Sequence, residues 1–383
     1  MLKHPLINQS VAAIDTPSLV LDLDAMERNL NAMQAFATQH GVRLRPHAKM
    51  HKSGQLALLQ MQAGAVGVCV QKTSEAQALA FSGVTNIYVS NQVIAPAKCA
   101  QLAQLCLSLS GHGGQLALAV DSLLGVQRTA HAMAQHGGAS VLDVFMEIDV
   151  GQARCGVPPG DAVVPLAQAI AQHRSLRFAG LQAYHGRAQH VRSVAERRAA
   201  MAAVLLDVQR TTAALGAAGF TVPLVTGAGT GTFGCEASSG VYGELQAGSY
   251  LFMDADYASN EHDPAQPQFE HALFIKSQVI SCTHTAQDSR AVVDAGHKSY
   301  AVDSGMPTVW AGHQAEWTVS NGGDEHGILR GSQLPALGDT VWLIPGHCDP
   351  TVNLHQHMVG VRGGLQYGVV ESIITVSARG ALT

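Results

Sequence analysis

The stretch RPHAKMHKS, residues 45–53, ends a short segment in which apolar and basic side chains alternate. A strand has a side-chain period of two, so a strand over 42–49 places four basic residues on one side: Arg43, Arg45, His47 and Lys49. Pro46 is tolerated better at the end of a strand than in its middle. The stretch therefore predicts that Lys49 lies at the carboxyl end of a strand.

Seven further segments repeat the pattern of a short apolar strand followed by a helix. The predicted strands are 66–70, 86–91, 115–121, 141–149, 176–184, 222–226 and 244–249. The clearest helices between strands are 53–63, 73–82, 95–110, 160–173 and 192–216. With 42–49 this makes eight strands, and the alternation predicts parallel pairing. We expect a (β/α)8 barrel, with an open doubly wound sheet as the alternative, and Lys49 on the rim where barrels carry active sites.

The pattern changes after the polar segment 259–268, SNEHDPAQPQ. Five strands are expected there without a convincing helix between them: 271–281, 291–295, 339–344, 356–362 and 367–376. An early strand, 17–23, precedes the barrel, and Asp24 is the expected N-cap of the helix that follows it. We therefore expect a barrel domain over 24–262 and an all-β domain made of 1–23 plus 263–383.

The composition is that of a well-buried globular enzyme, with 383 residues, 47% of them apolar and 13% charged. A net charge of −5 without a basic cluster argues against nucleic-acid binding. Seven scattered cysteines without a CxxC pair suit a reducing cytoplasm. The sequence has no signal-peptide pattern and no apolar run of about 18 residues, so no membrane span is expected.

Lys49 is the candidate for covalent chemistry. An enclosed lysine can attack a carbonyl, and on a barrel rim it is suited to form a Schiff base with the aldehyde of pyridoxal phosphate. The glycine-rich turn TGAGTG, residues 226–231, directly follows an apolar strand and can offer backbone N–H groups to a phosphate. Neither feature is specific alone, since most lysines are surface groups and many strand–helix turns are rich in glycine.

Two further segments carry candidate ligands. Arg154 lies on a loop between two glycines after strand 141–149, where a plain surface arginine is equally common. His347 and Asp349 follow the strand DTVWLI, and an extended backbone would point both the same way, with Cys348 opposite. Imidazole plus carboxylate suits a divalent ion such as Mn, Mg, Ca or Co. A polar turn without metal is the alternative.

Taken together, these segments resemble the D-threonine aldolase family, which belongs to the fold-type III pyridoxal-phosphate enzymes together with alanine racemase. The matching segments, spread over nearly the whole chain, are DTPSLVLDL, RPHAKMHKS, VCVQKTSEA, EIDVGQARCG, LQAYHGRAQH, TGAGTGTF, GVYGELQAGSYLFMDADY, GDEHG, PGHCDPTVNLH and VSARG. The resemblance implies an alanine-racemase-type barrel, a C-terminal β domain and a homodimer.

The resemblance also assigns roles to residues. Lys49 would hold the cofactor, and Arg154 would lie near its phenolic oxygen. The phosphate would be bound by the 226–231 turn, with Tyr257 close; the turn residues are Thr226, Gly229, Thr230 and Gly231. Gln246 would face the ring nitrogen, as a neutral side chain that holds a proton there only weakly. Tyr184 and Asp324 would line the pocket, and His347 and Asp349 would bind the metal.

The implied reaction is the cleavage of a D-3-hydroxy amino acid to glycine and an aldehyde, with His190 as the base that removes the hydroxyl proton. A 3-hydroxy-D-aspartate aldolase and a D-serine or 3-hydroxyaspartate dehydratase are the enzyme alternatives. Asp349 stands where the dehydratases carry cysteine and favours the aldolases. Arg187 could bind a distal carboxylate, although a solvated loop arginine is commoner. A pyridoxal-phosphate carrier is the non-enzyme alternative, and the metal pair argues against it and against a racemase.

Overall fold

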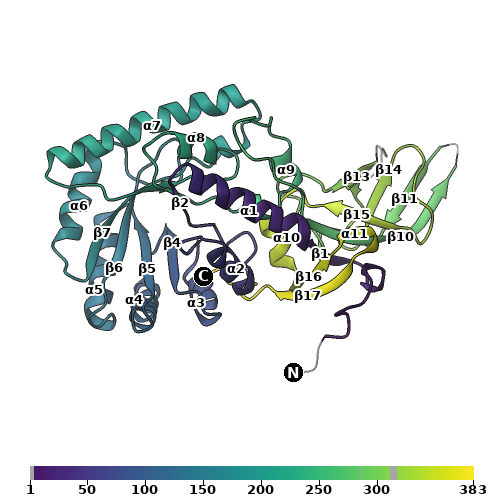
Figure 1. The fold of residues 1–383 in the computed structure, drawn as a ribbon, viewed down its shortest axis with the longest axis horizontal. Coiled ribbons are helices and arrows are strands. Elements are labelled where there is room, and N and C mark those ends of the chain that lie inside the picture. The colour runs from purple at the N-terminus through teal and green to yellow at the C-terminus, as the bar shows by residue number, and fades with distance from the viewer. Residues whose placement is uncertain (1–3, 286, 311–316) are drawn as a thin grey trace.

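The computed structural model describes residues 4–285, 287–310 and 317–383. A barrel of strands and helices lies beside a region built mainly of strands, and helix α1 (Leu23–Gln39) runs between them (Figure 1). No helix in the described part of the chain is both long and apolar enough to cross a membrane.

The barrel contains eight parallel strands in the order β2-β9-β8-β7-β6-β5-β4-β3. Their bounds are β2 Arg43–Leu44, β3 Val68–Val70, β4 Asn86–Gln92, β5 Gln115–Val120, β6 Leu142–Glu147, β7 Leu176–Ala183, β8 Val225–Gly227 and β9 Glu244–Leu245. Backbone hydrogen bonds from Val66 N to Leu44 O (2.9 Å) and from Cys69 N to Pro46 O (2.8 Å) join β2 to β3. This closure confirms the predicted barrel over the open sheet.

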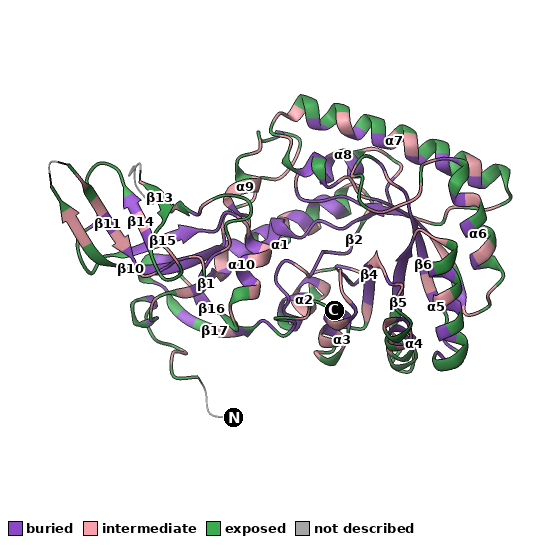
Figure 2. Ribbon diagram, turned by 180° about the vertical axis from the view of Figure 1, so that it is seen from behind, coloured by how far each residue is buried: buried purple, intermediate pink, exposed green. Residues whose placement is uncertain are grey.

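Helices surround the barrel strands, which are mostly buried, whereas the helices carry exposed residues on their outer faces (Figure 2). The barrel helices are α2 Gly54–Gln62, α3 Thr73–Phe81, α4 Pro96–Ser110, α5 Leu123–His136, α6 Val164–Ala171, α7 Val194–Ala217, α8 Phe233–Ser238 and α9 Ala255–Ala258. Sequence periodicity did not single out α5.

The strand predicted over 42–49 is shorter than expected. Strand β2 ends at Leu44, and after Pro46 only an isolated bridge between His47 and Cys69 continues the pairing. Lys49 therefore lies in a turn beyond the strand. Pro46 has no N–H to donate, which explains why the pairing of β2 ends early.

The predicted helix cap also shifts, because Asp22 and not Asp24 accepts hydrogen bonds from the first turn of α1.

The second region is a nine-stranded sheet. Its strands are β1 Ser18–Asp22, β10 Leu273–His284, β11 Ser289–Val293, β12 Thr308–Val309, β13 Thr318–Asn321, β14 Gly327–Arg330, β15 Thr340–Ile344, β16 His357–Arg362 and β17 Val369–Thr375. The early strand β1 pairs antiparallel with β10 and parallel with β16. The expectation of no helix here was wrong, because α10 (Cys348–Leu354) and α11 (Gly364–Tyr367) interrupt the strands.

Candidate active site

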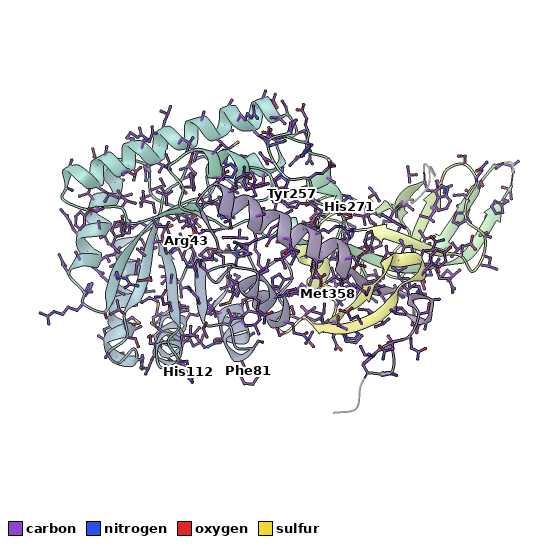
Figure 3. The ribbon with its side chains drawn as sticks, in the orientation of Figure 1. Arg43, Phe81, His112, Tyr257, His271 and Met358 are labelled. Atoms are coloured by element: carbon purple, nitrogen blue, oxygen red, sulfur yellow. The ribbon has the colours of Figure 1, made fainter. Side chains whose placement is uncertain are left out.

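A cavity of about 300 Å³ opens at the rim of the barrel. Its lining residues are His47, Lys49, Met50, Gln71, Ser90, Arg154, Gln182, Tyr184, Ala228, Gly229, Thr230, Gln246, Gly248, Ser249, Tyr257 and Asp349. Among them Asp349 alone comes from the β region. Tyr257 lies where the barrel meets that region (Figure 3). The cavity thus brings together eight residues that were predicted from the sequence. The first and last of them, Lys49 and Asp349, are 300 positions apart along the chain.

Lys49 projects into this cavity with 40% of its side chain exposed, and its Nζ contacts the Asp349 carboxylate. Burial lowers the pKa of Lys49, but Asp349 and Tyr184 more than offset this, so its net pKa is raised. The sequence argument expected an enclosed lysine whose amine can attack a carbonyl. The structure instead pairs it with an acid.

Lys52, three residues on, has a different environment. Its side chain is 7% exposed and pairs with Glu75 at 3.2 Å. Its Nζ also donates to Asn353 Oδ1 at 3.1 Å and to Ala381 O at 3.4 Å. These partners use all three N–H donors of the ammonium group, so Lys52 is less suited to covalent chemistry than Lys49, which projects into the cavity.

The glycine-rich turn follows β8, with Ala228 in the left-handed conformation at φ 72°. Gly229 and Thr230 line the cavity. Gly231 does not line it, and its N–H donates to Gln189 Oε1 at 2.9 Å. A left-handed residue in a turn helps to form a concave anion site from backbone N–H groups, so residues 228–230 remain the candidate phosphate-binding segment.

Thr226 lies below the cavity wall and is fully buried. Its hydroxyl accepts from Gln246 Nε2 at 2.8 Å and donates to Glu244 Oε1 at 2.9 Å. Thr226 therefore contacts the cavity through Gln246 and does not face it directly.

Arg154, Tyr184 and Tyr257 form one wall. The guanidinium carbon of Arg154 lies 5.9 Å from the Tyr184 ring centroid, within cation–π range. Burial raises the pKa of Tyr257 well above that of free tyrosine, and the nearby Tyr184 adds to this effect. Both tyrosines therefore stay neutral hydrogen-bonding groups.

His190 lies behind Tyr257 and does not line the cavity. Its ring centroid is 5.6 Å from that of Tyr257, and half of its side chain is exposed. His190 Nδ1 donates to Asp256 Oδ2 at 2.6 Å, which leaves Nε2 free to act as a base. Asp256 also pairs with Arg192.

His347 and Asp349 meet at the start of α10. His347 is the N-cap residue and has an extended backbone, whereas Asp349 already belongs to the helix. The turn of the helix, and not the predicted continuous strand, brings His347 Nε2 within 3.6 Å of Asp349 Oδ1. Cys348 is buried, and its thiol contacts Met253 O at 3.7 Å.

The donor atoms of this pair fit a divalent cation. Asp349 Oδ1 is buried without a hydrogen-bond partner in the described residues. His347 Nδ1 donates to Asp303 Oδ2 at 2.7 Å, an arrangement that turns Nε2 toward a ligand. Burial lowers the pKa of His347, but Asp349 and Asp303 raise it to about 9, so the site favours positive charge. No cluster of three His, Cys, Asp or Glu ligands occurs in residues 4–285, 287–310 and 317–383. Water or substrate would therefore complete the coordination.

Asp324 and Arg187 lie outside the cavity lining. Asp324 is 61% exposed and pairs with His297 at 2.7 Å. Arg187 is exposed at the start of the 3-10 helix η3 (Arg187–His190), and its backbone N–H donates to Gln152 Oε1 at 2.7 Å.

Sequence reasoning missed a polar wall next to Lys49. His47 Nε2 lies 2.9 Å from Gln71 Nε2 and 3.2 Å from Ser90 Oγ. Burial, followed by the charge of Lys49, keeps the pKa of His47 well below that of free histidine. The period of two had placed His47 on the side of Lys49, which was the available signal. Asp303 gave none, because it lies 44 residues from its partner His347.

A barrel-rim lysine, a glycine-rich turn and a separate β region define the alanine-racemase class of pyridoxal-phosphate proteins. Residues 21–256 match the family model described as alanine racemase, N-terminal domain, and residues 272–361 match the putative serine dehydratase domain.

Similarity extends further within this class. A D-threonine aldolase from Arthrobacter sp. is 44% identical over 97% of this chain and 94% of its own. A 3-hydroxy-D-aspartate aldolase from Paracoccus denitrificans is 43% identical over 96% of this chain and 92% of its own. The crystal structure of D-threonine aldolase from Filomicrobium marinum superposes with a TM-score of 0.93 at 44% identity, covering 98% of this chain and 99% of that one. The chain belongs to the D-threonine aldolase family.

Proposed function

We propose that this protein is a pyridoxal-phosphate- and divalent-metal-dependent aldolase that cleaves D-3-hydroxy amino acids of the D-threonine type to glycine and an aldehyde. One observation carries the proposal. Lys49 of the barrel and Asp349 of the β region share one cavity, so a covalently held cofactor and a cation can act on the same substrate.

The barrel residues would hold the cofactor. Lys49 would bind its aldehyde carbon, Gly229 and Thr230 would bind its phosphate, and Arg154 would lie near its phenolic oxygen. When bound, this cofactor accepts the electrons of a broken bond at the substrate α-carbon. Tyr184 and Tyr257 line the same cavity and would limit the access of water to the bound cofactor.

His347 and Asp349 would hold the metal, with Mn, Mg, Ca or Co as candidates. Such an ion lowers the pKa of a hydroxyl group that binds it. His190, held at Nδ1 by Asp256, lies outside the cavity lining, so it would accept the proton of the substrate's β-hydroxyl at Nε2 through a bridging water. Loss of that proton drives the carbon–carbon cleavage that releases the aldehyde.

A 3-hydroxy-D-aspartate substrate is the second candidate, supported by the 43% identical relative from Paracoccus denitrificans. We further propose a homodimer, on the basis of the family resemblance. A cytoplasmic location is supported by seven cysteines that form no disulfide.

The test is a product assay. The purified chain, loaded with pyridoxal phosphate, is incubated with D-threonine and with both 3-hydroxyaspartate diastereomers, with and without Mn²⁺. Glycine plus an aldehyde, formed only with the metal, supports the aldolase. Ammonia plus a keto acid would identify a dehydratase. Bound cofactor without turnover of any substrate would identify a carrier.

A further inference from the structure

A chain of hydrogen bonds runs beneath the cavity from Glu244, which pairs with two arginines, through Thr226 to Gln246. Glu244 is completely buried, and its Oε2 contacts Arg43 at 2.9 Å and Arg45 at 3.1 Å. Its Oε1 contacts the Thr226 hydroxyl at 2.9 Å, and the same hydroxyl contacts Gln246 Nε2 at 2.8 Å. The chain connects the strand ends of β2, β8 and β9, which are neighbours in the barrel.

The chemistry of the groups fixes the direction of this chain. A carboxylate that is paired with arginines can only accept hydrogen bonds. The single hydroxyl hydrogen of Thr226 therefore goes to Glu244, and Thr226 must accept from its other neighbour. An amide accepts through oxygen and donates through nitrogen, so the nitrogen of Gln246 must face Thr226.

This direction decides which end of the Gln246 amide the cavity meets. The carbonyl oxygen is turned away from Thr226 and has no hydrogen-bond partner in the described residues, while the side chain lines the cavity. Gln246 therefore presents an acceptor there. On a pyridoxal ring, the protonated ring nitrogen is the N–H donor that an acceptor can bind.

We propose that Glu244 and Thr226 are positioning residues that hold Gln246 with its carbonyl toward the cofactor, so that the cofactor's ring nitrogen is bound in its protonated form. This inference rests on the proposed function. A neutral amide holds the proton of the ring nitrogen less firmly than a carboxylate does, as the sequence suggested. The buried Glu244 nevertheless fixes which end of the Gln246 amide faces the cofactor.

The test uses the full-length chain reconstituted with pyridoxal phosphate that carries ¹⁵N at the ring nitrogen. The ¹⁵N resonance of the wild-type holoenzyme is expected at the pyridinium position near neutral pH. Thr226→Val removes the hydroxyl and frees the amide to rotate, so the resonance should move toward the unprotonated position. Thr226→Ser restores the hydroxyl and should restore the pyridinium resonance.

Thr211→Val is the matched control, since Thr211 is an equally buried and hydrogen-bonded threonine on α7. It should leave the resonance unchanged. A wild-type resonance at the unprotonated position would overturn the inference, as would a Thr226→Val holoenzyme that keeps the pyridinium resonance. The wild-type spectrum decides the question even where Thr226→Val does not fold. Failure of the proposed function is distinct, since the chain would then show no lysine-bound cofactor absorbance.

Discussion

On the barrel side of the cavity, Lys49, Thr230 and Gln246 follow the carboxyl ends of neighbouring strands. On the β side, Asp349 stands on the first turn of the short helix α10. Gln246 is held by Thr226, and the Thr230 hydroxyl accepts from Tyr250 N at 3.0 Å. Asp349 Oδ1 has no such partner in the described residues. Hydrogen bonds within the barrel thus hold Gln246 and Thr230 in place, whereas Asp349 Oδ1 on the β side is left to bind a ligand.

Asp254 connects the two sides. It is buried, and its carboxylate accepts from Tyr257 N and from Cys348 N, each at 3.0 Å. One side chain therefore caps α9, which carries Tyr257, and also accepts from the first N–H of α10, which carries Asp349. This contact joins the two halves of the cavity, together with the backbone hydrogen bond from Ala255 N to Pro345 O at 3.0 Å.

Replacing the barrel-side lysine should have the largest effect. Lys49→Ala removes the amine that binds the cofactor, so both the visible absorbance of lysine-bound cofactor and all measurable cleavage should be lost. Absorbance spectra before and after dialysis measure this. Lys298→Ala, at an exposed lysine paired with Glu325, is the control and should behave as wild type. A band that survives dialysis in Lys49→Ala would refute the assignment.

Replacing the β-side acid should separate the two halves. Asp349→Asn removes the charge that attracts a cation, so we expect Mn²⁺ affinity to fall by at least about 100-fold and cleavage with it. Cofactor absorbance should persist, because the barrel residues are unchanged. Calorimetric titration with Mn²⁺ measures the affinity. Asp207→Asn, at a helix surface, is the control, and equal Mn²⁺ binding by Asp349→Asn and wild type would contradict the metal site.

Removing the Asp254 carboxylate, which connects the two sides, should weaken both cofactor and metal binding. Asp254→Ala deletes two hydrogen bonds to a buried carboxylate, at a cost of about 2–4 kcal/mol in the free energy of unfolding. Urea unfolding followed by circular dichroism measures this. Asp22→Ala, which removes the N-cap of α1 away from the cavity, should cost about 1 kcal/mol. The proposed role of Asp254 fails if cofactor and metal affinities are unchanged in Asp254→Ala.

The same contrast explains what the sequence could predict. Strand–helix alternation predicts the barrel because each βα unit is local, and Lys49, Gly229 and Gln246 are found at its rim. The metal pair was expected for the wrong reason, since an N-cap and a helical turn replace the extended backbone. The contacts of Asp254 with Cys348 and of Asp303 with His347 carried no pattern, because the partners lie 94 and 44 residues apart along the chain. Contacts between the two halves depend on tertiary packing, which periodicity does not encode.

The smallest effect concerns the support of the barrel side. Glu236 on α8 is fully buried and accepts from the Thr232 hydroxyl at 2.7 Å, directly after the glycine-rich turn. Burial raises the pKa of Glu236 to about 7, although the bond from Thr232 opposes this. Because this pKa lies above that of the unfolded chain, the stability that protonated Glu236 contributes is complete at low pH and is lost as pH rises through about 7. Between pH 6 and 8 the free energy of unfolding of the wild type should fall by about 1 kcal/mol relative to that of Glu236→Gln, which has no proton to release.

Urea midpoints of both proteins across this pH range measure the difference. Glu196→Gln, at an exposed position, is the control and should keep the wild-type dependence on pH. Parallel curves for wild type and Glu236→Gln would mean that the acid is not buried beneath the turn in the folded chain.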